Sequence, residues 1–349
     1  MHTEKIHQSS YGSRGFTLLE LMIALAIGML ISFGLFRVFA NSSETYQALS
    51  QAAEQVENGR YAIQVLRDDL RLAGYYGEYG FPPAAGAVLP DPCELANAAT
   101  MHSALPFYVQ GYNNVAVSPL TCLNSADVVA GTDILVIRRA NTAATALGSL
   151  DANEVYMQAN SDPANTANPI IAFGTDTSPP AKYTLTKKDG VTPAEIRKYH
   201  VDIYFVSPCN VPSGSTNCTA AADGGRPIPT LKRMSIALDG TGTLARIIEP
   251  IAEGIESLQV DYGVDTDGDG MPNGNFLAAP ASNPAWSDVM AVQLHVLART
   301  LEQTVGPVDT KTYKLGTAPD VVSPGDRFRR HVFTSEVRLV NPAGRRETP

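Results

Sequence analysis

The sequence predicts an α+β protein in which a long N-terminal helix, part of it inserted in a membrane, packs on an antiparallel β-sheet head. Two observations predict this class: an uninterrupted helical pattern over residues 17–72, and a series of short segments with alternating apolar and polar residues after it. Of the 349 residues, 44% are hydrophobic and only 17% are charged, which favours a folded body over a disordered chain. A formal net charge of -9 argues against nucleic acid as a direct partner.

The helical pattern begins with an apolar segment that is long enough to cross a membrane. Residues 21–36 carry no charge, and with residues 16–19 the run approaches the length that spans a bilayer core of roughly 30 Å. A cleaved secretory signal is the alternative, but no small-residue cleavage site follows the run. Lys5 and Arg14 precede it, so the positive-inside rule places residues 1–15 in the cytoplasm and the head outside it.

The second half of the helix is expected to be amphipathic. No proline interrupts the pattern, so we expect one helix roughly 84 Å long, with a transmembrane half at 16–40 and an amphipathic half at 41–73. Gly59 is one of its weak points, because glycine costs about 1 kcal/mol relative to alanine in an exposed helix. The apolar positions that recur at helical spacing are Tyr46, Leu49, Ala53, Val56, Ile63, Leu66 and Leu70.

Residues 74–349 are expected to form a β-rich extracytoplasmic head. Glycines and prolines after Ala73 end the helix. Residues 140–180, rich in Ala, Asn, Pro and Thr, are expected to form surface loops or insertions. The expected strands are residues 133–138, 199–206, 231–238, 257–262, 289–298 and 331–340.

All four cysteines lie in the predicted head, in a compartment where disulfides persist. They allow three pairings. We favour the local pairs, Cys93 with Cys122 and Cys209 with Cys218, because each closes a loop between structured segments. On the chain-entropy model these bonds contribute about 3.5 and about 2.7 kcal/mol. A zinc site is disfavoured, because no CxxC pair is present.

Residues 265–270, DTDGDG, match the first half of a calcium-binding loop, in which alternating carboxylates converge on one hard cation. The metal candidates are Asp265, Asp267 and Asp269. The twelfth position, where a bidentate Glu belongs, is Phe276, so another residue has to close the site. The candidates for this are Asn273 and Asp288. The alternative is an Asp/Gly-rich turn between strands. We expect no cofactor, with calcium as the one candidate.

The sequence offers little support for an enzyme. It contains no GxSxG, HExxH or phosphate-binding glycine motif. His200, His295 and His331 fall in β-like segments, where partly buried sheet residues are expected rather than ligands. We therefore expect the protein not to be an enzyme. The alternative of another class is a membrane-anchored periplasmic enzyme whose site is assembled from residues distant in sequence.

The sequence GFTLLE at residues 15–20 resembles the type III signal of type IV pilins and pseudopilins. In that family a prepilin peptidase cuts after the glycine and methylates the new N-terminal residue. The resemblance implies a leader at residues 1–15, cleavage between Gly15 and Phe16, and N-methylation of Phe16. It also places Glu20 at the fifth mature position, where the family requires an acid.

Residues 66–77, 258–270 and 327–341 resemble a PilW-type minor pilin, and the J-type minor pseudopilin of type II secretion is the runner-up. The resemblance implies a type IV pilin-like fold and a structural protein that joins other minor pilins to prime type IV pilus assembly at the filament tip. Implied partners are other minor pilins, the major pilin, the prepilin peptidase and the inner-membrane assembly platform. The implied location is the inner membrane, single-pass with the head in the periplasm, and then the extracellular pilus.

Glu20 supports this resemblance on physical grounds. A carboxylate in a membrane helix costs about 2.5 to 3.5 kcal/mol on insertion scales, so it is expected to have a partner. Cleavage after Gly15 creates that partner, because the new α-amine of Phe16 stays cationic when methylated and can meet Glu20 of a neighbouring subunit. The alternative is a charge that stays near the membrane interface by snorkelling.

Overall fold

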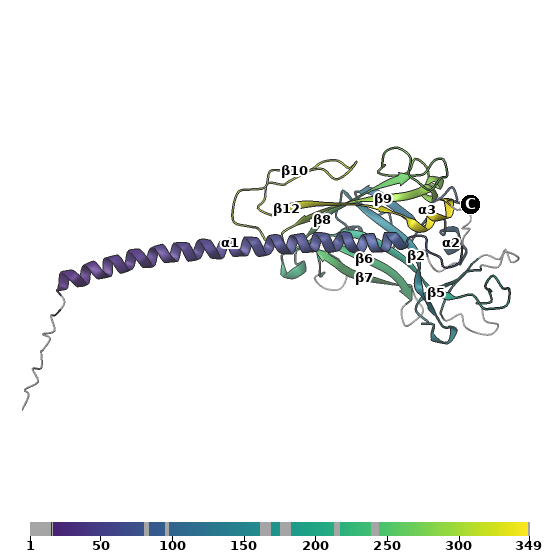
Figure 1. The fold of residues 1–349 in the computed structure, drawn as a ribbon, viewed down its shortest axis with the longest axis horizontal. Helices are drawn as coiled ribbons and strands as arrows, with labels where there is room; N and C mark the ends of the chain where they lie inside the picture. Colours follow the sequence, from purple (N-terminus) through teal and green to yellow (C-terminus); the bar gives the residue numbers. More distant parts are fainter. Residues whose placement is uncertain are drawn as a thin grey trace, which may run out of the picture. The chain divides into compact units, whose positions relative to one another are not determined.

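The computed structural model describes residues 15, 17–79, 84–94, 98–160, 169–174, 183–212, 217–238 and 244–347. The chain divides into two compact units, residues 1–50 and residues 51–349. Helix α1, Leu18–Leu72, contributes residues to both units. It begins one residue later than the sequence predicts and ends at the expected residue. The class is α+β, as expected, with antiparallel sheets following the helix (Figure 1).

In the first unit, α1 is apolar and exposed. Leu18, Met29 and Phe39 are 77%, 75% and 73% exposed, and no residue of the most apolar segment is buried. Among the described residues, α1 is the one helix long and apolar enough to cross a membrane. A helix of this composition fits a membrane anchor, because its apolar side chains have no protein core to enter.

In the second unit, α1 has a buried face that differs from the expected one. Its buried residues are Gln55, Gly59, Ala62, Ile63, Leu66, Asp69 and Leu70. Tyr46 and Leu49, also expected on the apolar face, lie in the first unit and are 73% and 68% exposed. The spacing of apolar residues in the sequence does not reveal this face, because the polar Gln55 and Asp69 and the small Gly59 form part of it. The amide Nε2 of Gln55 donates to the carbonyl oxygens of Ala298 at 2.7 Å and Arg329 at 2.9 Å.

The larger sheet has seven strands, all antiparallel. Its path runs β1-β2-β5-β3-β4, and β6 and β7 extend it from another part of β5. The long strand β5 therefore pairs with β2 along one edge, and with β3 and then β6 along the other. The strands are β1 Val109–Val115, β2 Thr132–Thr145, β3 Val155–Gln158, β4 Ile170–Phe173, β5 Ile196–Ser207, β6 Thr230–Leu238 and β7 Leu244–Glu253.

A second sheet has the order β12-β9-β8, and a two-stranded ribbon pairs β10 with β11. In Figure 1, residues 51–72 of α1 lie between β12 on one side and β6 and β7 on the other. The strands are β8 Ile255–Val264, β9 Val289–Arg299, β10 Thr312–Tyr313, β11 Val321–Val322 and β12 Arg330–Arg338, and the further helices are α2 Ala98–Ser103 and α3 Val340–Glu347. Short 3₁₀ turns lie at Ser125–Asp127, Leu147–Ser149, Ala222–Gly224 and Pro284–Asp288.

All six expected strands are present, within β2, β5, β6, β8, β9 and β12. The assignment of residues 140–180 to loops is wrong in part, because β2 continues to Thr145 and β3 and β4 lie in this range. Four-residue strands such as β3 are too short for an alternating pattern to be distinct. The last expected strand ends at Arg338 instead of Val340, where α3 begins. Strand β7 was missed because it contains Pro250, which an edge strand tolerates.

Asp133 connects the two larger sheets. It lies on β2 and is 2% exposed. Its carboxylate accepts one hydrogen bond from the backbone N–H of Asn114 at 2.7 Å and another from that of Val260, on β8, at 2.8 Å. Gln259 on β8 adds a bond to the carbonyl oxygen of Gly131 at 2.7 Å. The junction is therefore fixed by polar bonds as well as by the apolar core.

Candidate functional site

The expected processing site is described only in part. Gly15 is exposed, while Phe16 and residues 1–14 lie outside the described residues. Thr17 and Glu20 form a reciprocal cap at the start of α1. The hydroxyl Oγ1 of Thr17 accepts from the N–H of Glu20 at 3.2 Å, and Oε2 of Glu20 accepts from the N–H and the hydroxyl of Thr17, both at 2.9 Å.

This cap gives Glu20 a local role that the sequence analysis missed. A Thr followed three residues later by Glu is the capping-box pattern, so TLLE was the signal. Both hydrogen bonds end on Oε2, and Oε1 has no bond to a described residue. The cap therefore holds the carboxylate at the first turn of the helix and leaves one oxygen to accept from another group.

Two disulfides join the pairs that the sequence favours, Cys93 with Cys122 and Cys209 with Cys218. Cys93 and Cys122 are buried at the edge of the main hydrophobic core. The second bond closes a loop after β5, and the N–H of Cys218 donates to Oδ1 of Asp127 at 2.8 Å. Both bonds stabilise loops of the head, because they restrict the unfolded chain.

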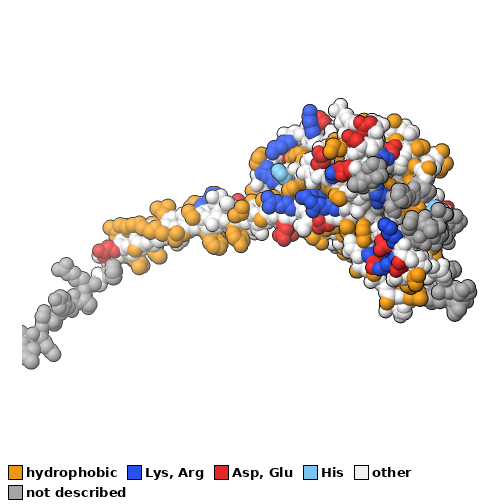
Figure 2. Space-filling model, turned by 45° about the vertical axis from the view of Figure 1, so that its right-hand side comes forward, with side chains coloured by type: hydrophobic (Ala, Val, Ile, Leu, Met, Phe, Trp, Pro, Cys, Tyr) orange, Lys and Arg blue, Asp and Glu red, His pale blue; other side chains and the backbone are white. Residues whose placement is uncertain are grey.

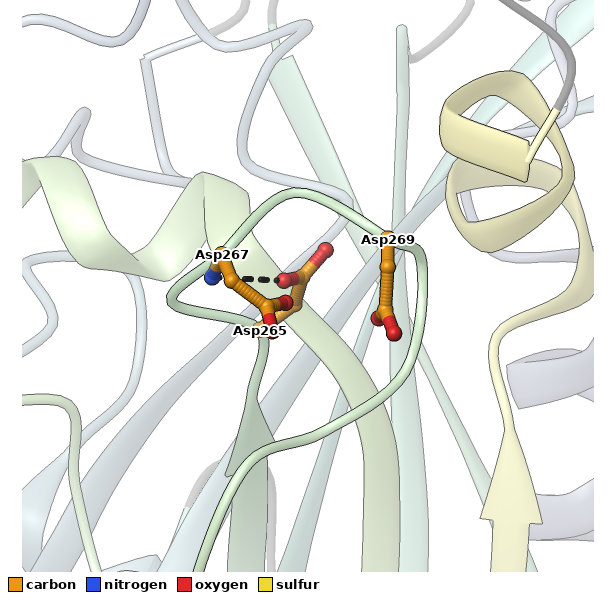
Figure 3. A group of neighbouring side chains, drawn as sticks. All are labelled: Asp265, Asp267 and Asp269. Carbon is orange, nitrogen blue, oxygen red and sulfur yellow. Dashed lines mark hydrogen bonds between the residues drawn. The ribbon is translucent and has the colours of Figure 1, made fainter.

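The carboxylates of Asp265, Asp267 and Asp269 come together in the loop after β8, with one oxygen from each within 4.8 Å of the others (Figure 3). Asp265 is 2% exposed and the other two are exposed. Oδ1 of Asp265 accepts from the N–H groups of Asp267 and Gly268, at 3.2 and 2.6 Å. Oδ2 accepts from the N–H of Gly270 at 2.9 Å. The loop thus wraps around one buried carboxylate.

Arg346 on α3 is the cation that this carboxylate binds. Its Nη1 lies 2.8 Å from Oδ2 of Asp265, and its Nη2 pairs with Asp288. Burial alone would raise the pKa of Asp265, but the Arg346 guanidinium and the backbone N–H groups of Gly270 and Gly268 outweigh it and lower the pKa to about 2. The charged form of Asp265 is therefore strongly favoured.

In this structure, protein groups already occupy much of this donor set. Calcium needs six to eight oxygens, whereas both oxygens of Asp265 already accept from N–H groups and one of them binds a guanidinium. The two expected closing ligands are also engaged. Oδ1 of Asn273 accepts from the N–H of Thr266 at 2.6 Å, and Asp288 pairs with Arg346. Within the described residues, Arg346 is the cation that pairs with both Asp265 and Asp288.

Two family models match the chain. Residues 11–36 match the prokaryotic N-terminal methylation motif, which covers the GFTLLE junction and the start of α1. Residues 215–341 match type IV pilus-assembly protein W, which covers β6 to β12 and the acidic loop. Together, the two matches support a PilW-like type IV minor pilin. The match agrees with the first of the two families that the sequence resembles.

Other comparisons add little to the PilW-like assignment. No curated protein matches the chain significantly. A solved structure that resembles part of it is a type IV-like pilin from Thermus thermophilus, with 16% sequence identity and a TM-score of 0.21, covering 41% of this chain and 78% of that one. A likeness at this TM-score carries no argument, so the fold rests on the elements described above.

One arrangement in the PilW-like pilin resembles a catalytic triad. Nε2 of His295 lies 3.3 Å from Oδ2 of Asp261, and its Nδ1 lies 3.3 Å from Oγ1 of Thr334. The N–H of Thr317 also donates to Oδ2 of Asp261 at 3.0 Å. The backbone at Gly316 lies so close to the ring that an added Cβ would be 2.5 Å from Nε2 of His295. The loop before β11 therefore covers the imidazole and the carboxylate. This network links β8, β9 and β12 beneath the loop, where His295 is 6% exposed.

The other two histidines of the expected strands lie in different surroundings. His200 on β5 faces a polar cavity of about 340 Å³. Burial, with the nearby Arg139, Lys198 and Arg233, lowers the pKa of His200 to about 3, so the ring is neutral near pH 7. His331 is exposed on β12, and its ring contacts Phe333 edge-on at 4.7 Å.

A buried polar cluster fixes the last turns of α1 on the larger sheet. Oδ1 of Asp69 lies 2.9 Å from Nη2 of Arg139 on β2, and Oδ2 accepts from the hydroxyl of Tyr204 on β5. Asp202 lies beside this pair and bonds to Ser235 at 2.6 Å, and burial raises its pKa. The sequence pattern gave no sign of these partners of α1, because they come from three separate strands, β2, β5 and β6.

Proposed function

We propose that this PilW-like pilin primes type IV pilus assembly as one member of a minor-pilin complex at the filament tip, and that its role is structural and not enzymatic. The observation that carries the proposal is the combination of the methylation motif with the match to type IV pilus-assembly protein W. The exposed apolar segment of α1 supports a membrane-anchored subunit before assembly. The head would then lie in the periplasm until the filament carries it outside the cell.

Glu20 would connect neighbouring subunits. A methylated α-amine on Phe16 remains cationic, and Oε1 of Glu20 is available to a partner because the cap uses Oε2. In a bundle of membrane helices, the amine of one subunit would neutralise the acid of another. The proposed partners are the other minor pilins and the major pilin, with the prepilin peptidase and the inner-membrane assembly platform acting before incorporation.

Processing is tested first, on protein extracted from membranes. Intact mass and N-terminal sequencing should show a chain that starts at Phe16 with one added methyl group. Replacing Gly15 with a bulky residue should leave the precursor uncleaved, because the peptidase needs a small residue there. A mature chain that starts beyond Ala40 would identify an ordinary secretory signal and end the pilin proposal.

Assembly is tested in a deletion strain complemented with single variants. Deletion should remove most filaments, and labelled protein should be found at filament ends. Glu20→Ala should be processed and inserted normally, since it removes a costly membrane charge, but should restore few filaments. Glu44→Ala, which removes an exposed acid farther along α1, is the control and should restore them. Label spread along the filaments contradicts the tip position, and normal pili with lost secretion would favour the type II pseudopilin.

A further inference from the structure

A groove of about 480 Å³ runs between α1 and β12 in the second unit. Its floor is apolar: Ile63 is buried and Phe333 is half-buried. Its rim is polar, and the arginines that line it, Arg60 and Arg67, are exposed. The other lining residues are Gln64, Asp68, Thr334 and Ser335. An apolar floor with a charged rim is the usual form of a peptide-binding groove.

The groove lies beside an open strand edge. In the three-stranded sheet β12 is the outer strand, and within the described residues it pairs only with β9. The middle of β12, at Phe333 to Ser335, is the part that lines the groove. An edge strand presents unpaired N–H and C=O groups that can pair with an added strand. The groove therefore offers backbone hydrogen bonds as well as side-chain contacts.

The charge of this surface is opposite to that of the whole chain. Arg60, Arg67 and Arg71 are spaced seven and four residues apart, so they follow one face of α1. None of the three forms an ion pair with another described residue. Figure 2 shows Lys and Arg side chains gathered along the helix where it crosses the head. Since the chain carries a net charge of -9, this strip selects for an acidic partner.

We infer that the groove between α1 and β12 binds an extended acidic segment of a partner protein, which adds as a strand beside β12 and places its carboxylates near Arg60 and Arg67. Seven helical residues rise by roughly 10 Å, which is about the length of three extended residues. An extended segment of about four residues is therefore long enough to reach from Arg60 to Arg67 along the groove. The inference rests on the groove and does not depend on the proposed position at the filament tip.

Peptide binding to the full chain in detergent tests the inference directly. The probe is a fluorescently labelled ten-residue peptide of alternating valine and glutamate, compared with a valine–lysine peptide by anisotropy at low salt. We expect the Kd of the glutamate peptide to be at least tenfold lower. A fully N-methylated peptide of the same sequence keeps the charge but cannot pair with β12, so its binding should be lost.

Charge reversal tests where the peptide binds. The double variant Arg60→Glu with Arg67→Glu should reverse the preference between the two peptides, and it should fold normally because both side chains are exposed. The matched control reverses two other exposed cations, Lys188→Glu with Lys314→Glu, and should bind as the unmutated chain does. Circular dichroism and melting curves confirm that both double variants are folded.

Three results would overturn the inference. Equal affinity for the glutamate and lysine peptides would show that the arginines do not select charge. Full binding of the N-methylated peptide would exclude strand addition to β12. Displacement of the peptide by inorganic polyphosphate at equal charge concentration would indicate a non-specific anion surface. None of these results depends on filament assembly, so a failure of the tip proposal would leave the peptide test unchanged.

Discussion

Replacing Arg346 with glutamine tests whether a side chain takes the position of a metal ion in the acidic loop. Arg346 lies 2.8 Å from Oδ2 of Asp265, whose side chain is fully buried. Its removal leaves that carboxylate with backbone N–H donors only, and leaves Asp288 without its cation. The loop around Asp265 and the attachment of α3 should both weaken.

The size of the effect follows from the pKa of Asp265. The drop from 3.8 to about 2 corresponds to about 2.5 kcal/mol that favours the charged carboxylate in the folded state. Backbone donors supply part of this, and Arg346 is partly screened by water, so its share is about 1 to 2 kcal/mol. For a chain of this size that loss lowers Tm by roughly 1 to 3 °C.

The pH dependence has a defined sign. Because the folded-state pKa of Asp265 is depressed, its contribution is fully present above the unfolded value near 4 and is lost as the pH falls toward 2. The difference in unfolding free energy between the unmutated chain and Arg346→Gln should therefore be largest at neutral pH and small near pH 2. Lys314→Gln, which removes an exposed lysine, is the control and should change neither quantity.

The assay is thermal unfolding of the full chain in detergent, with millimolar calcium, with chelator and with magnesium. We expect identical melting curves for the unmutated chain, because Arg346 holds the carboxylate that an ion would need. A double-mutant cycle of Arg346→Gln with Asp265→Asn should give a coupling energy of about 1 to 2 kcal/mol. Stabilisation of the unmutated chain by calcium, or a coupling energy near zero, would refute the reasoning.

Three further predictions concern the stability of the head. Gly59→Ala should lower the free energy of unfolding in urea by about 1 kcal/mol, although alanine favours a helix, because the added Cβ would lie 2.1 Å from Cε2 of Phe333. In a Phe333→Leu background the same substitution should stabilise the chain instead. Burial raises the pKa of Asp133 to about 6. This acid should therefore make the chain about 3 kcal/mol less stable above pH 6 than below pH 4. Asp133→Asn should remove that difference, measured by urea titrations at pH 4 and pH 7. Replacing both Cys93 and Cys122 with serine should lower the unfolding free energy by about 3.5 kcal/mol in denaturant titrations, and a loss under about 1 kcal/mol would contradict the chain-entropy argument.

The elements that could be predicted have strong local signals. The helix Leu18–Leu72 follows from apolar spacing and the lack of proline. Six strands follow from β-like runs of six or more residues, several of which alternate apolar and polar residues. The short strands β3 and β4 gave no such signal, and β7 was hidden by Pro250. Local pairing of the cysteines was predicted because each pair closes a loop between structured segments.

The buried face of α1 could not be predicted in the same way. Gln55 and Asp69 are polar, and sequence patterns place polar residues outside a core. They are buried because distant segments supply hydrogen-bond or ionic partners: the carbonyl of Ala298 for Gln55, and Arg139 for Asp69. Gly59 was counted as a weak point of the helix, whereas the structure shows that it admits the ring of Phe333.

The sequence by itself determined the long apolar helix, the N-terminal methylation motif and the α+β class, because these depend on residue type at short spacing along one segment. Only the tertiary structure decided that Asp265 binds Arg346, and that Arg60 and Arg67 border an open edge of β12. In each case the partner lies far along the chain, 81 residues away for Asp265. A carboxylate accepts a metal ion or a guanidinium through the same oxygens, so the chemistry of such a loop is settled by which cation the fold brings to it.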